Sequence, residues 1–234
     1  MCIRDRSLTS VNSFSTRRPV RSFVRRQGRI TSSQKSALVE LLPKYGIQYS
    51  MDVGLLPSNL TGDPDFPLIL DIGFGDGELL TSMAKNKVGT NFIGIEVYNA
   101  GIGHCLKLIE QNKIDNLKLV CGDAVEVMQF GIENESLDEI NLLFPDPWPK
   151  KRHHKRRIIN PEFIELMSKK LVLGGLVNIS TDWENYAEQV LDLFDQREDF
   201  VKKPSFTRDE NTKFEKRGIS LGHEIFDFTY KLMS

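Results

Sequence analysis

Short apolar runs alternate with amphipathic stretches along most of the chain beyond residue 66. The run PLILDIG (67–73), for example, is bounded by turn-forming residues, which is typical of a buried strand. This alternation indicates βαβ units, and therefore an α/β fold whose mostly parallel sheet is covered by helices on both faces. Strands are predicted at 67–73, 91–97, 117–123, 139–146 and 174–181, and helices at 77–86, 102–112, 124–130, 160–172 and 183–196.

The two ends of the chain depart from this alternation. Before it, Ser32 or Ser33 can cap a helix that Pro43 would stop, and a connecting loop is expected at 43–67. After it, the segment GHEIFDFTYKLM (222–233) alternates polar and apolar residues. This last pattern predicts an antiparallel edge strand at the C-terminus.

The formal net charge of −1 conceals a sharp separation of charge along the chain. Residues 1–30 hold eight Arg and one acid, residues 150–157 hold six Lys and Arg, and the remainder holds 17 basic and 31 acidic residues. Two basic segments on an acidic body are either solvated surface or a contact for an anionic partner, most simply a nucleic-acid backbone. We expect a flexible basic arm over 1–31 and a single folded domain over 32–234.

Composition argues against several other classes of protein. No apolar run approaches the roughly 18–20 residues of a membrane span, so no membrane association is expected. The three cysteines lack CxxC spacing and the four histidines form no ligand pattern. These features favour reduced thiols, a cytoplasmic location and no bound metal. The Arg-rich and Ser-rich N-terminus also has the composition of an organellar transit peptide.

Acidic residues follow four successive predicted strands. They are Asp71, Glu96, Asp123 and Asp146. In open α/β sheets the ligand binds beyond the carboxyl ends of the strands, so these side chains are candidates for a binding site. Asp123 alone could equally be the N-cap of the following helix, but four such acids in succession are not expected of a structural scaffold.

The first acid opens the loop DIGFGDG (71–77) between the first strand and the next helix. Its glycines, Gly73, Gly75 and Gly77, permit a tight turn and close approach of a ligand to the backbone. The spacing differs from the GxGxxG loop of nicotinamide dehydrogenases, and a carboxylate at Asp76 would repel a pyrophosphate. The loop would suit a cationic ligand without phosphate, such as S-adenosyl-L-methionine.

The second and third acids suit the adenosine part of such a ligand. Glu96 can accept hydrogen bonds from both ribose hydroxyls, as an acid at this place does in nicotinamide enzymes. Asp123 can accept one from the adenine amino group, while Ala124 donates its backbone N–H to the ring.

Asp146 lies between two prolines in the segment FPDPW (144–148). Proline fixes φ and removes a backbone donor, so the loop is pre-shaped and leaves the carboxylate few neighbouring donors. A carboxylate can accept two hydrogen bonds from the N1–H and amino group of guanine, and Trp148 offers a stacking face. The alternative is a proline-bounded turn with a core tryptophan.

A basic block begins two residues after Trp148. It can hold the phosphates of the strand that bears the target base, and its two histidines add donors and stacking planes. The alternative is the solvated start of a basic helix. The block consists of Lys150, Lys151, Arg152, His153, His154, Lys155, Arg156 and Arg157.

Seven segments together resemble the bacterial tRNA (guanine-N7-)-methyltransferase family, from about residue 17 to the C-terminus. The resemblance implies a Rossmann-like class I methyltransferase fold, doubly wound, with S-adenosyl-L-methionine as methyl donor. It also implies tRNA as substrate, modified at N7 of the variable-loop guanine (position 46 in standard tRNA numbering), without a second protein. The segments are RSFVRRQGRIT, DIGFGDGELL, GIEVYNAGIGHCLKLI, GDAVEVM, FPDPWPKKRHHKRRI, STDWENYAEQVL and TKFEKRG.

The resemblance also assigns roles to single residues. It implies cofactor contacts at Asp71, Glu96, Asp123 and Asp146, with Asp146 as the catalytic residue as well. Asp71 stands where other family members often have Glu, which has a longer side chain. Transfer to N7 needs no general base, because this nitrogen of neutral guanine has a lone pair and no proton.

The remaining implied residues concern the RNA substrate. Because RSFVRRQGR belongs to the family pattern, residues 21–29 would not be a cleaved transit peptide, and Arg25 and Arg26 are expected to contact RNA. Substrate contacts are implied at Lys150, Asp182, Thr212, Lys213, Phe214 and Glu215.

Three other functions are compatible with parts of this pattern. A methyltransferase acting on an adenine amino group in RNA has a related Asp/Asn-Pro-Pro-aromatic loop, but here Trp148 follows a single proline. A non-catalytic RNA-binding protein with the same fold would be expected to lose the strand-end acids, and all four are present. A nicotinamide dehydrogenase is disfavoured by the glycine spacing.

Overall fold

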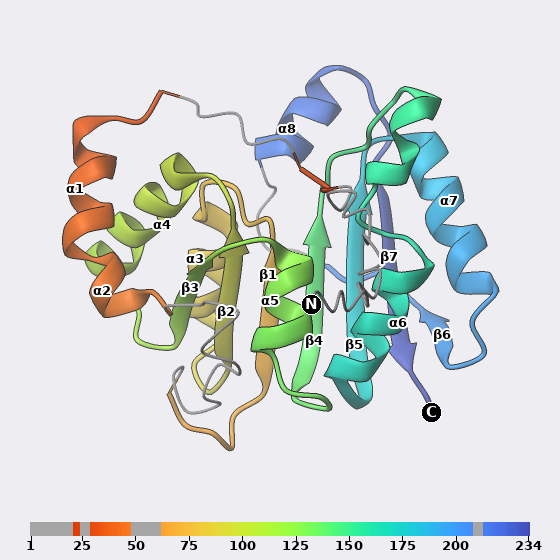
Figure 1. The fold of residues 1–234 in the computed structure, drawn as a ribbon, viewed down its shortest axis with the longest axis horizontal. Helices are drawn as coiled ribbons and strands as arrows, with labels where there is room; N and C mark the ends of the chain where they lie inside the picture. Colours follow the sequence, from red (N-terminus) through yellow and green to blue (C-terminus); the bar gives the residue numbers. More distant parts are fainter. Residues whose placement is uncertain (1–20, 24–28, 48–61, 208–212) are drawn as a thin grey trace, which may run out of the picture.

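Seven strands form one sheet within residues 21–23, 29–47, 62–207 and 213–234, which the computed structural model describes (Figure 1). The strand order is β3-β2-β1-β4-β5-β7-β6. Strands β1 to β5 run parallel, and β7 is antiparallel to both of its neighbours. The strands are β1 (Leu68–Ile72), β2 (Asn91–Glu96), β3 (Leu117–Cys121), β4 (Leu137–Leu143), β5 (Leu171–Thr181), β6 (Phe200–Lys203) and β7 (Phe226–Leu232).

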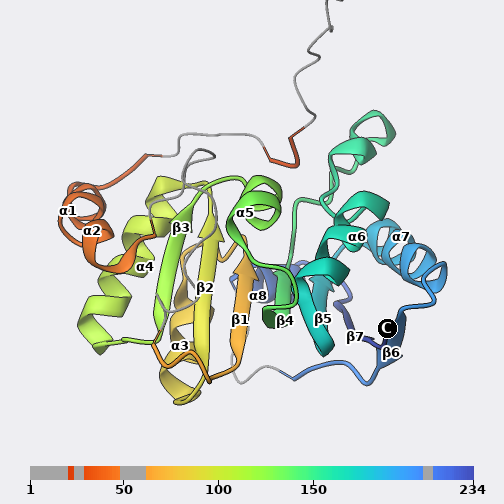
Figure 2. The ribbon, with the colours of Figure 1, turned by 60° about the horizontal axis from the view of Figure 1, so that its bottom comes forward.

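Helices cover the two faces of this sheet and form two separate apolar cores. On one face α1, α3 and α4 pack over β1, β2 and β3, around Leu80, Phe92 and Ile102. On the other face α5, α6 and α7 pack around Met128 and Phe163 (Figure 2). The predicted α/β class with a mostly parallel sheet is therefore confirmed. The helices are α1 (Ser32–Glu40), α2 (Leu42–Tyr45), α3 (Glu78–Asn86), α4 (Asn99–Asn112), α5 (Ala124–Gly131), α6 (Pro161–Lys170), α7 (Glu184–Asp195) and α8 (Lys213–Ser220), with a 3₁₀ helix η2 (Lys151–Arg156).

The start of the folded chain differs from the prediction for local reasons. Thr31 caps α1, rather than Ser32 or Ser33, because its hydroxyl accepts a hydrogen bond from the Gln34 N–H while the Gln34 side chain accepts one from the Thr31 N–H. Pro43 does not end the helical region but lies in the first turn of α2, where its missing N–H is not needed.

The C-terminal strand is antiparallel as predicted, but it is not the edge strand. Strand β6 pairs outside β7 and forms the edge. Of the four residues in β6, Phe200 alone is buried, so the segment has no apolar run that would predict a strand. Strand β4 also ends earlier than predicted, at Leu143, because Phe144 has φ of 56° and leaves the extended conformation.

A row of buried polar side chains crosses β4, β5 and β7 on the face that α3 covers only in part. Asn141, Asn178 and Thr229 are register partners in these strands. Asn178 donates to Asn141 at 3.0 Å, and Thr229 donates to Asn178 at 2.9 Å. The Thr229 hydroxyl accepts from the Phe206 N–H at 3.0 Å, so the row fixes the segment that leads from β6 toward α8.

The loop after β1 packs directly on the backbone of α4. A Cβ atom at Gly101 would lie 2.0 Å from the carbonyl oxygen of Gly75. One at Gly77, whose φ is 80°, would lie 2.4 Å from the sulfur of Cys105. Because glycine has no Cβ, the two segments approach each other more closely than other residues permit.

We predict that Gly101→Ala destabilises the protein by about 1–3 kcal/mol, because the new methyl group would displace the loop backbone. Helix propensity alone predicts the opposite sign, a gain of up to about 1 kcal/mol for Gly→Ala in a helix. Urea denaturation followed by circular dichroism separates the two, and a stabilised variant would contradict the packing inferred here.

Candidate active site

Three of the four strand-end acids lie close together where the strand order reverses. Strand β1 pairs with β2 on one side and with β4 on the other, so the chain segments after these strands meet at one edge of the sheet. The charge of Glu96 contributes to raising the pKa of Asp71, and the charge of Asp146 contributes to raising the pKa of Glu96. This edge of the sheet is thus a concentration of negative charge.

The Asp71 carboxyl group is buried, and no hydrogen-bond donor in the described part of the chain reaches it. Burial raises its pKa to about 7, with contributions from the charges of Glu139 and Glu96. Glu139 has no counterpart among the residues predicted from the sequence. It lies on β4, opposite Ile69 of β1, which precedes Asp71 by two residues. A buried, unpaired acid that is partly ionised at neutral pH favours a cation beside it.

The Glu96 carboxylate accepts hydrogen bonds from backbone N–H groups of two segments that border the site. One carboxylate oxygen accepts hydrogen bonds from the N–H groups of Val97 and Tyr98 at 2.6 and 3.1 Å. The other accepts from the Gly75 N–H at 3.0 Å. Burial raises the pKa of Glu96 more than these three donors lower it. The carboxylate therefore shapes the glycine loop and keeps limited accepting capacity for a ligand.

The glycine loop has the conformation that its sequence predicts. Gly73, Gly75 and Gly77 have φ of 74°, 63° and 80°, a region that other residues rarely adopt. No atom lies within 4 Å of the place where a Cβ of Gly73 would be, so the loop backbone is open on that side. The ring of His104, which sequence analysis set aside, lies 2.9 Å from the Asp76 carbonyl oxygen and supports the loop from α4.

Asp123 is the N-cap of α5, which was the alternative interpretation of this residue. One of its carboxylate oxygens accepts a hydrogen bond from the Val125 N–H at 3.0 Å. Ala124 is the first residue of the helix. The capping role is compatible with a ligand contact, because a carboxylate has further lone pairs. A contact of either residue with adenine stays a prediction.

The segment 144–148 is a strained loop with an exposed Asp146 at its centre. Phe144 and Trp148 have φ of 56° and 46°, and a left-handed conformation costs a residue with a side chain roughly 1–2 kcal/mol. Hydrogen bonds hold both ends of the loop. The Phe144 N–H donates to the Ser180 carbonyl at 2.8 Å, and the Trp148 indole N–H donates to the Ser22 carbonyl at 2.9 Å.

The basic block forms η2 and places most of its cations at the surface. Lys150, Lys151, Arg152 and Lys155 are exposed. Two of the remaining side chains, His153 and Arg156, contact Trp148, and the guanidinium carbon of Arg156 lies 4.9 Å from the centre of its ring.

The two histidines of the block are half-buried. The His153 ring contacts Trp148 edge-on with the centres 5.8 Å apart. Partial burial and then the neighbouring cations, Arg152 first, lower the pKa of His153, which favours its neutral form at neutral pH. The His154 ring lies 3.2 Å from the Arg157 guanidinium and is directed into the protein.

The expectation that Arg157 contacts RNA phosphate is wrong. This side chain is only 2% exposed, and its guanidinium group binds protein atoms rather than facing solvent. It donates to the Pro147 carbonyl and to acceptors on Asn185 and Gln189 of α7. A run of like charges does not reveal which of its members turns inward, so the sequence offered no signal for this difference.

The TDW segment and α8 lie against each other. Asp182 contacts His223, with Nδ1 and Oδ2 3.1 Å apart. A Cβ at Gly218 of α8 would lie 3.3 Å from Asp182, and Glu215 of the same helix is buried. His223 has no sequence signal that distinguishes it from a surface histidine.

Several predicted residues cannot be compared with the structure. Thr212, Arg25 and Arg26 lie outside the described residues, as does most of the predicted arm. Lys213 and Phe214 begin α8, but their side chains lie outside the description as well.

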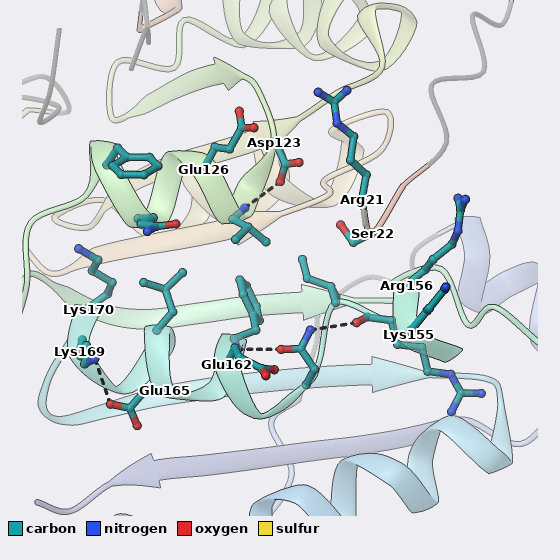
Figure 3. Close-up of a pocket in the computed structure, with 18 of the residues that line it drawn as sticks. Arg21, Ser22, Asp123, Glu126, Lys155, Arg156, Glu162, Glu165, Lys169 and Lys170 are labelled. Carbon is teal, nitrogen blue, oxygen red and sulfur yellow. Dashed lines mark hydrogen bonds and ion pairs between the residues drawn. The ribbon is translucent and has the colours of Figure 1, made fainter. Parts of the chain in front are cut away.

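A groove of about 890 Å³ lies between α5 and α6 (Figure 3). Figure 3 shows Arg21, Lys155 and Arg156 at one end of this groove, on the side of Asp123. At the far end Lys170 is buried and donates to the Ile132 carbonyl at 2.7 Å, so it has a structural role. The cations of the first end extend the basic surface of η2 toward the predicted adenine side of the site.

Comparison with known proteins gives close relatives over nearly the whole chain. A family model described as "Putative methyltransferase" matches residues 65–228. The tRNA (guanine-N(7)-)-methyltransferase of Nitrosococcus oceani is 44% identical over 219 residues, which cover 92% of this chain and 91% of that protein. The enzyme of the same name from Vibrio parahaemolyticus is 45% identical over 224 residues, covering 92% of each chain. The chain belongs to the tRNA (guanine-N7-)-methyltransferase family.

More distant structures agree with this family in fold. An rRNA methylase from Streptococcus thermophilus superposes with a TM-score of 0.51 at 14% identity, over 73% of this chain and 89% of that one. The 16S rRNA methyltransferase KamB gives a TM-score of 0.53 at 12% identity, over 72% and 88%. At these identities the likeness shows the class I methyltransferase fold that the sequence resemblance implied.

Two further searches of the described residues bear on other functions. No group of three or more His, Cys, Asp and Glu side chains there is arranged to hold a metal ion. No helix in the same residues is long and apolar enough to cross a membrane.

We predict that affinity for S-adenosyl-L-methionine rises as pH increases through about 7, because a cationic ligand favours the ionised form of Asp71. Below that pH the affinity should fall by up to about tenfold per unit. Isothermal titration calorimetry between pH 5.5 and 8.5 measures this. Asp71→Asn should bind more weakly at pH 8 and show a smaller pH dependence, and the titration of the ligand itself is common to both proteins.

In the ligand-free protein, ionisation of the buried Asp71 is unfavourable, so Asp71→Asn should also change the pH dependence of folding stability. Since burial raises the folded-state pKa of Asp71 above the ordinary 3.8, wild-type stability should fall as pH rises from about 4 to about 7. Asp71→Asn should lack this decline. Equal stability profiles for the two proteins would contradict the burial of an unpaired acid.

Proposed function

We propose that this protein transfers the methyl group of S-adenosyl-L-methionine to N7 of a guanine in tRNA, the variable-loop guanine at position 46. Family membership over 92% of the chain supports the reaction. The observation that supports it best in the structure is the cluster of Asp71, Glu96 and Asp146 beside an exposed basic block. A cationic donor suits the first feature and a polyanionic substrate the second.

The residues around the glycine loop fit this donor. The buried Asp71 carboxylate has no hydrogen-bond partner among the residues that the structure describes, which suits the ammonium or sulfonium charge, and the open backbone at Gly73 permits close approach of the ligand. Glu96 and Asp123 would accept hydrogen bonds from the ribose hydroxyls and the adenine amino group, and Ala124 would donate to the ring. When bound, the donor supplies an electrophilic methyl group on its sulfonium.

Asp146 is the proposed catalytic residue. It would accept hydrogen bonds from the N1–H and amino group of guanine and thereby present N7 to the methyl group. The N7 lone pair, held in this way, would form the new carbon–nitrogen bond as the donor's carbon–sulfur bond is released, so that positive charge would pass from sulfur to a base held by Asp146. Orientation of this kind can lower a barrier by about 7–11 kcal/mol, and the carboxylate would also stabilise the cationic base.

The substrate would be held on both sides of this loop. We propose that the exposed cations Lys150, Lys151, Arg152 and Lys155 contact tRNA phosphates, with Arg156 and Trp148 beneath them. The family resemblance adds Asp182, Thr212, Lys213, Phe214 and Glu215 as substrate contacts, and Arg25 and Arg26 as RNA contacts on the N-terminal arm.

Two broader features of the proposal rest on the family alone. The enzyme would act without a second protein and in the cytoplasm, as the bacterial-type resemblance implies. We propose the division into an arm over 1–31 and a catalytic domain over 32–234 on the same basis.

The test is to incubate the purified protein with methyl-labelled S-adenosyl-L-methionine and unmodified tRNA, digest the RNA and identify the labelled nucleoside. N7-methylguanosine is expected, and a tRNA with adenine at position 46 should lose the label. Recovery of N6-methyladenosine would instead select an adenine amino-group methyltransferase, and absence of transfer would select a non-catalytic RNA-binding protein.

We predict that Asp146→Asn lowers kcat by about 10²–10³, the range for loss of one preorganised transition-state contact. The affinity for S-adenosyl-L-methionine should fall less than kcat does, because Asp71 and Glu96 remain to face the donor while the guanine contact is lost. Single-turnover kinetics and calorimetry measure the two quantities. Asp192→Asn, an exposed acid on α7, is the matched control. Equal losses in both quantities would make Asp146 a cofactor residue instead.

We predict that Lys151→Gln/Lys155→Gln weakens tRNA binding and reduces the slope of log K against log salt by about 1.4–1.8, the value for two phosphate contacts. Lys85→Gln/Lys87→Gln removes the same charge from the exposed C-terminal end of α3 and its C-cap and should leave the slope unchanged. Filter binding at several salt concentrations gives both slopes, and identical slopes for the two variants would rule out phosphate contacts at η2.

A further inference from the structure

We propose that Arg157 is a positioning residue that holds the loop bearing Asp146 against helix α7. The proposal rests on the proposed function in one respect, the catalytic importance of that loop. In sequence Arg157 is the last cation of the basic block, yet it is among the largest fully buried side chains of the protein.

The inner end of the guanidinium group contacts the active-site loop itself. Its Nε–H donates to the carbonyl oxygen of Pro147 at 2.8 Å. Pro147 directly follows Asp146, and neither it nor Pro145 has an N–H with which the loop could hold itself. The hydrogen bond from Arg157 therefore fixes the peptide group next to the proposed catalytic carboxylate.

The outer end of the guanidinium group contacts α7. Nη1 donates to the Gln189 side chain at 2.6 Å and to the Asn185 carbonyl at 3.3 Å. Nη2 donates to the Asn185 side chain at 3.1 Å and lies 3.2 Å from Nε2 of His154. With the Nε–H these contacts occupy all five donors of the group, so none remains for a phosphate.

The helix that Arg157 contacts is itself firmly placed. Tyr186 of α7 is fully buried, and the guanidinium carbon of Arg157 lies 4.7 Å from the centre of its ring. The Tyr186 hydroxyl accepts from the Ile159 N–H at 3.2 Å, and the Gln189 amide donates to the Ile159 carbonyl at 3.0 Å. Arg157 thus links the loop to a helix anchored in the core.

This link also relates two parts of the site to each other. Helix α7 begins two residues after Asp182, the acid of the TDW segment. Through Arg157, the loop bearing Asp146 and the helix that follows Asp182 keep one relative position. Lysine could not replace this link, because its ammonium lacks the planar fork that contacts both partners at once.

The backbone of the loop needs such support. Phe144 and Trp148, on either side of Asp146, are both in the left-handed region. Conformations of this kind persist where surrounding contacts hold them, and Arg157 holds the carbonyl group of Pro147, the residue directly after Asp146. Without it the loop would relax, and a displacement of about 1 Å can cost on the order of 10²-fold in rate.

The test compares Arg157→Lys and Arg157→Gln with Lys155→Gln, an exposed cation of the same block. Circular dichroism first establishes the temperature at which each variant is folded. Should Arg157→Gln not fold, Arg157→Lys and Gln189→Ala, which removes one acceptor on α7, give the same comparison with smaller expected effects. Methyl transfer by the wild type, measured alongside, tests the proposed function separately.

The expected result is a loss of about 10–100-fold in kcat for the Arg157 variants, with tRNA affinity and its salt slope unchanged. Lys155→Gln should instead weaken tRNA binding and lower its salt slope, whereas Lys85→Gln, at an exposed lysine of α3, should leave kcat, affinity and slope unchanged. Normal kcat with weakened, less salt-dependent binding in the Arg157 variants would overturn the proposal and restore a phosphate contact.

A second readout needs no activity. The chain has two tryptophans, so Trp183→Phe leaves Trp148 in the active-site loop as the sole tryptophan, whose emission can be excited selectively over that of tyrosine. In that background, loss of Arg157 should increase acrylamide quenching of Trp148 and shift its emission before any RNA is added. Lys155→Gln should not. Unchanged Trp148 fluorescence in the Arg157 variants would show that Arg157 does not hold the loop.

Discussion

Parallel pairing of β1 with β2 on one side and β4 on the other is the constraint on which the site depends. It brings the ends of three strands to one edge and opens a crevice where the connections leave in opposite directions. Asp71, Glu96 and Asp146 thereby interact electrostatically although they are far apart in sequence. Burial and repulsion raise the pKa values of the first two, and a bound cation would relieve that repulsion.

The basic segment after the active-site loop shows how uniform charge can serve different purposes. Its exposed lysines face solvent, whereas Arg156 stacks on Trp148 and Arg157 lies inside the protein. The same short stretch of chain thus provides an electrostatic surface, a support for the tryptophan and an internal brace. Proximity in sequence would let one segment hold the anionic substrate and shape the loop that is proposed to act on it.

Most of the fold could be predicted from the sequence because buried parallel strands leave continuous apolar runs. Strand β6 could not, since a short edge strand with one buried residue has no such run. The glycine loop was predictable because only glycine suits its backbone.

The gathering of the strand-end acids was predictable, whereas the contacts of each acid were less so. Strand ends reveal which acids gather, but not that Glu96 bonds three backbone N–H groups or that Asp123 caps α5. The orientation of Arg157 depends on α7, which lies far along the chain, so no local pattern encodes it. Contacts between segments distant in sequence decide the orientation of such a side chain, and the pattern of apolar and polar residues along the chain carries no information about those contacts.

The hydrogen bond between the Trp148 indole and the Ser22 carbonyl has a thermodynamic consequence. It joins the segment bearing Arg21 to the active-site loop, so the free energy of ordering either one includes the other. Under the proposed function, an RNA that binds the segment bearing Arg21 would by linkage also favour the loop conformation to which that segment is bonded. Recognition of the RNA backbone and order in the proposed catalytic loop would then be parts of one equilibrium.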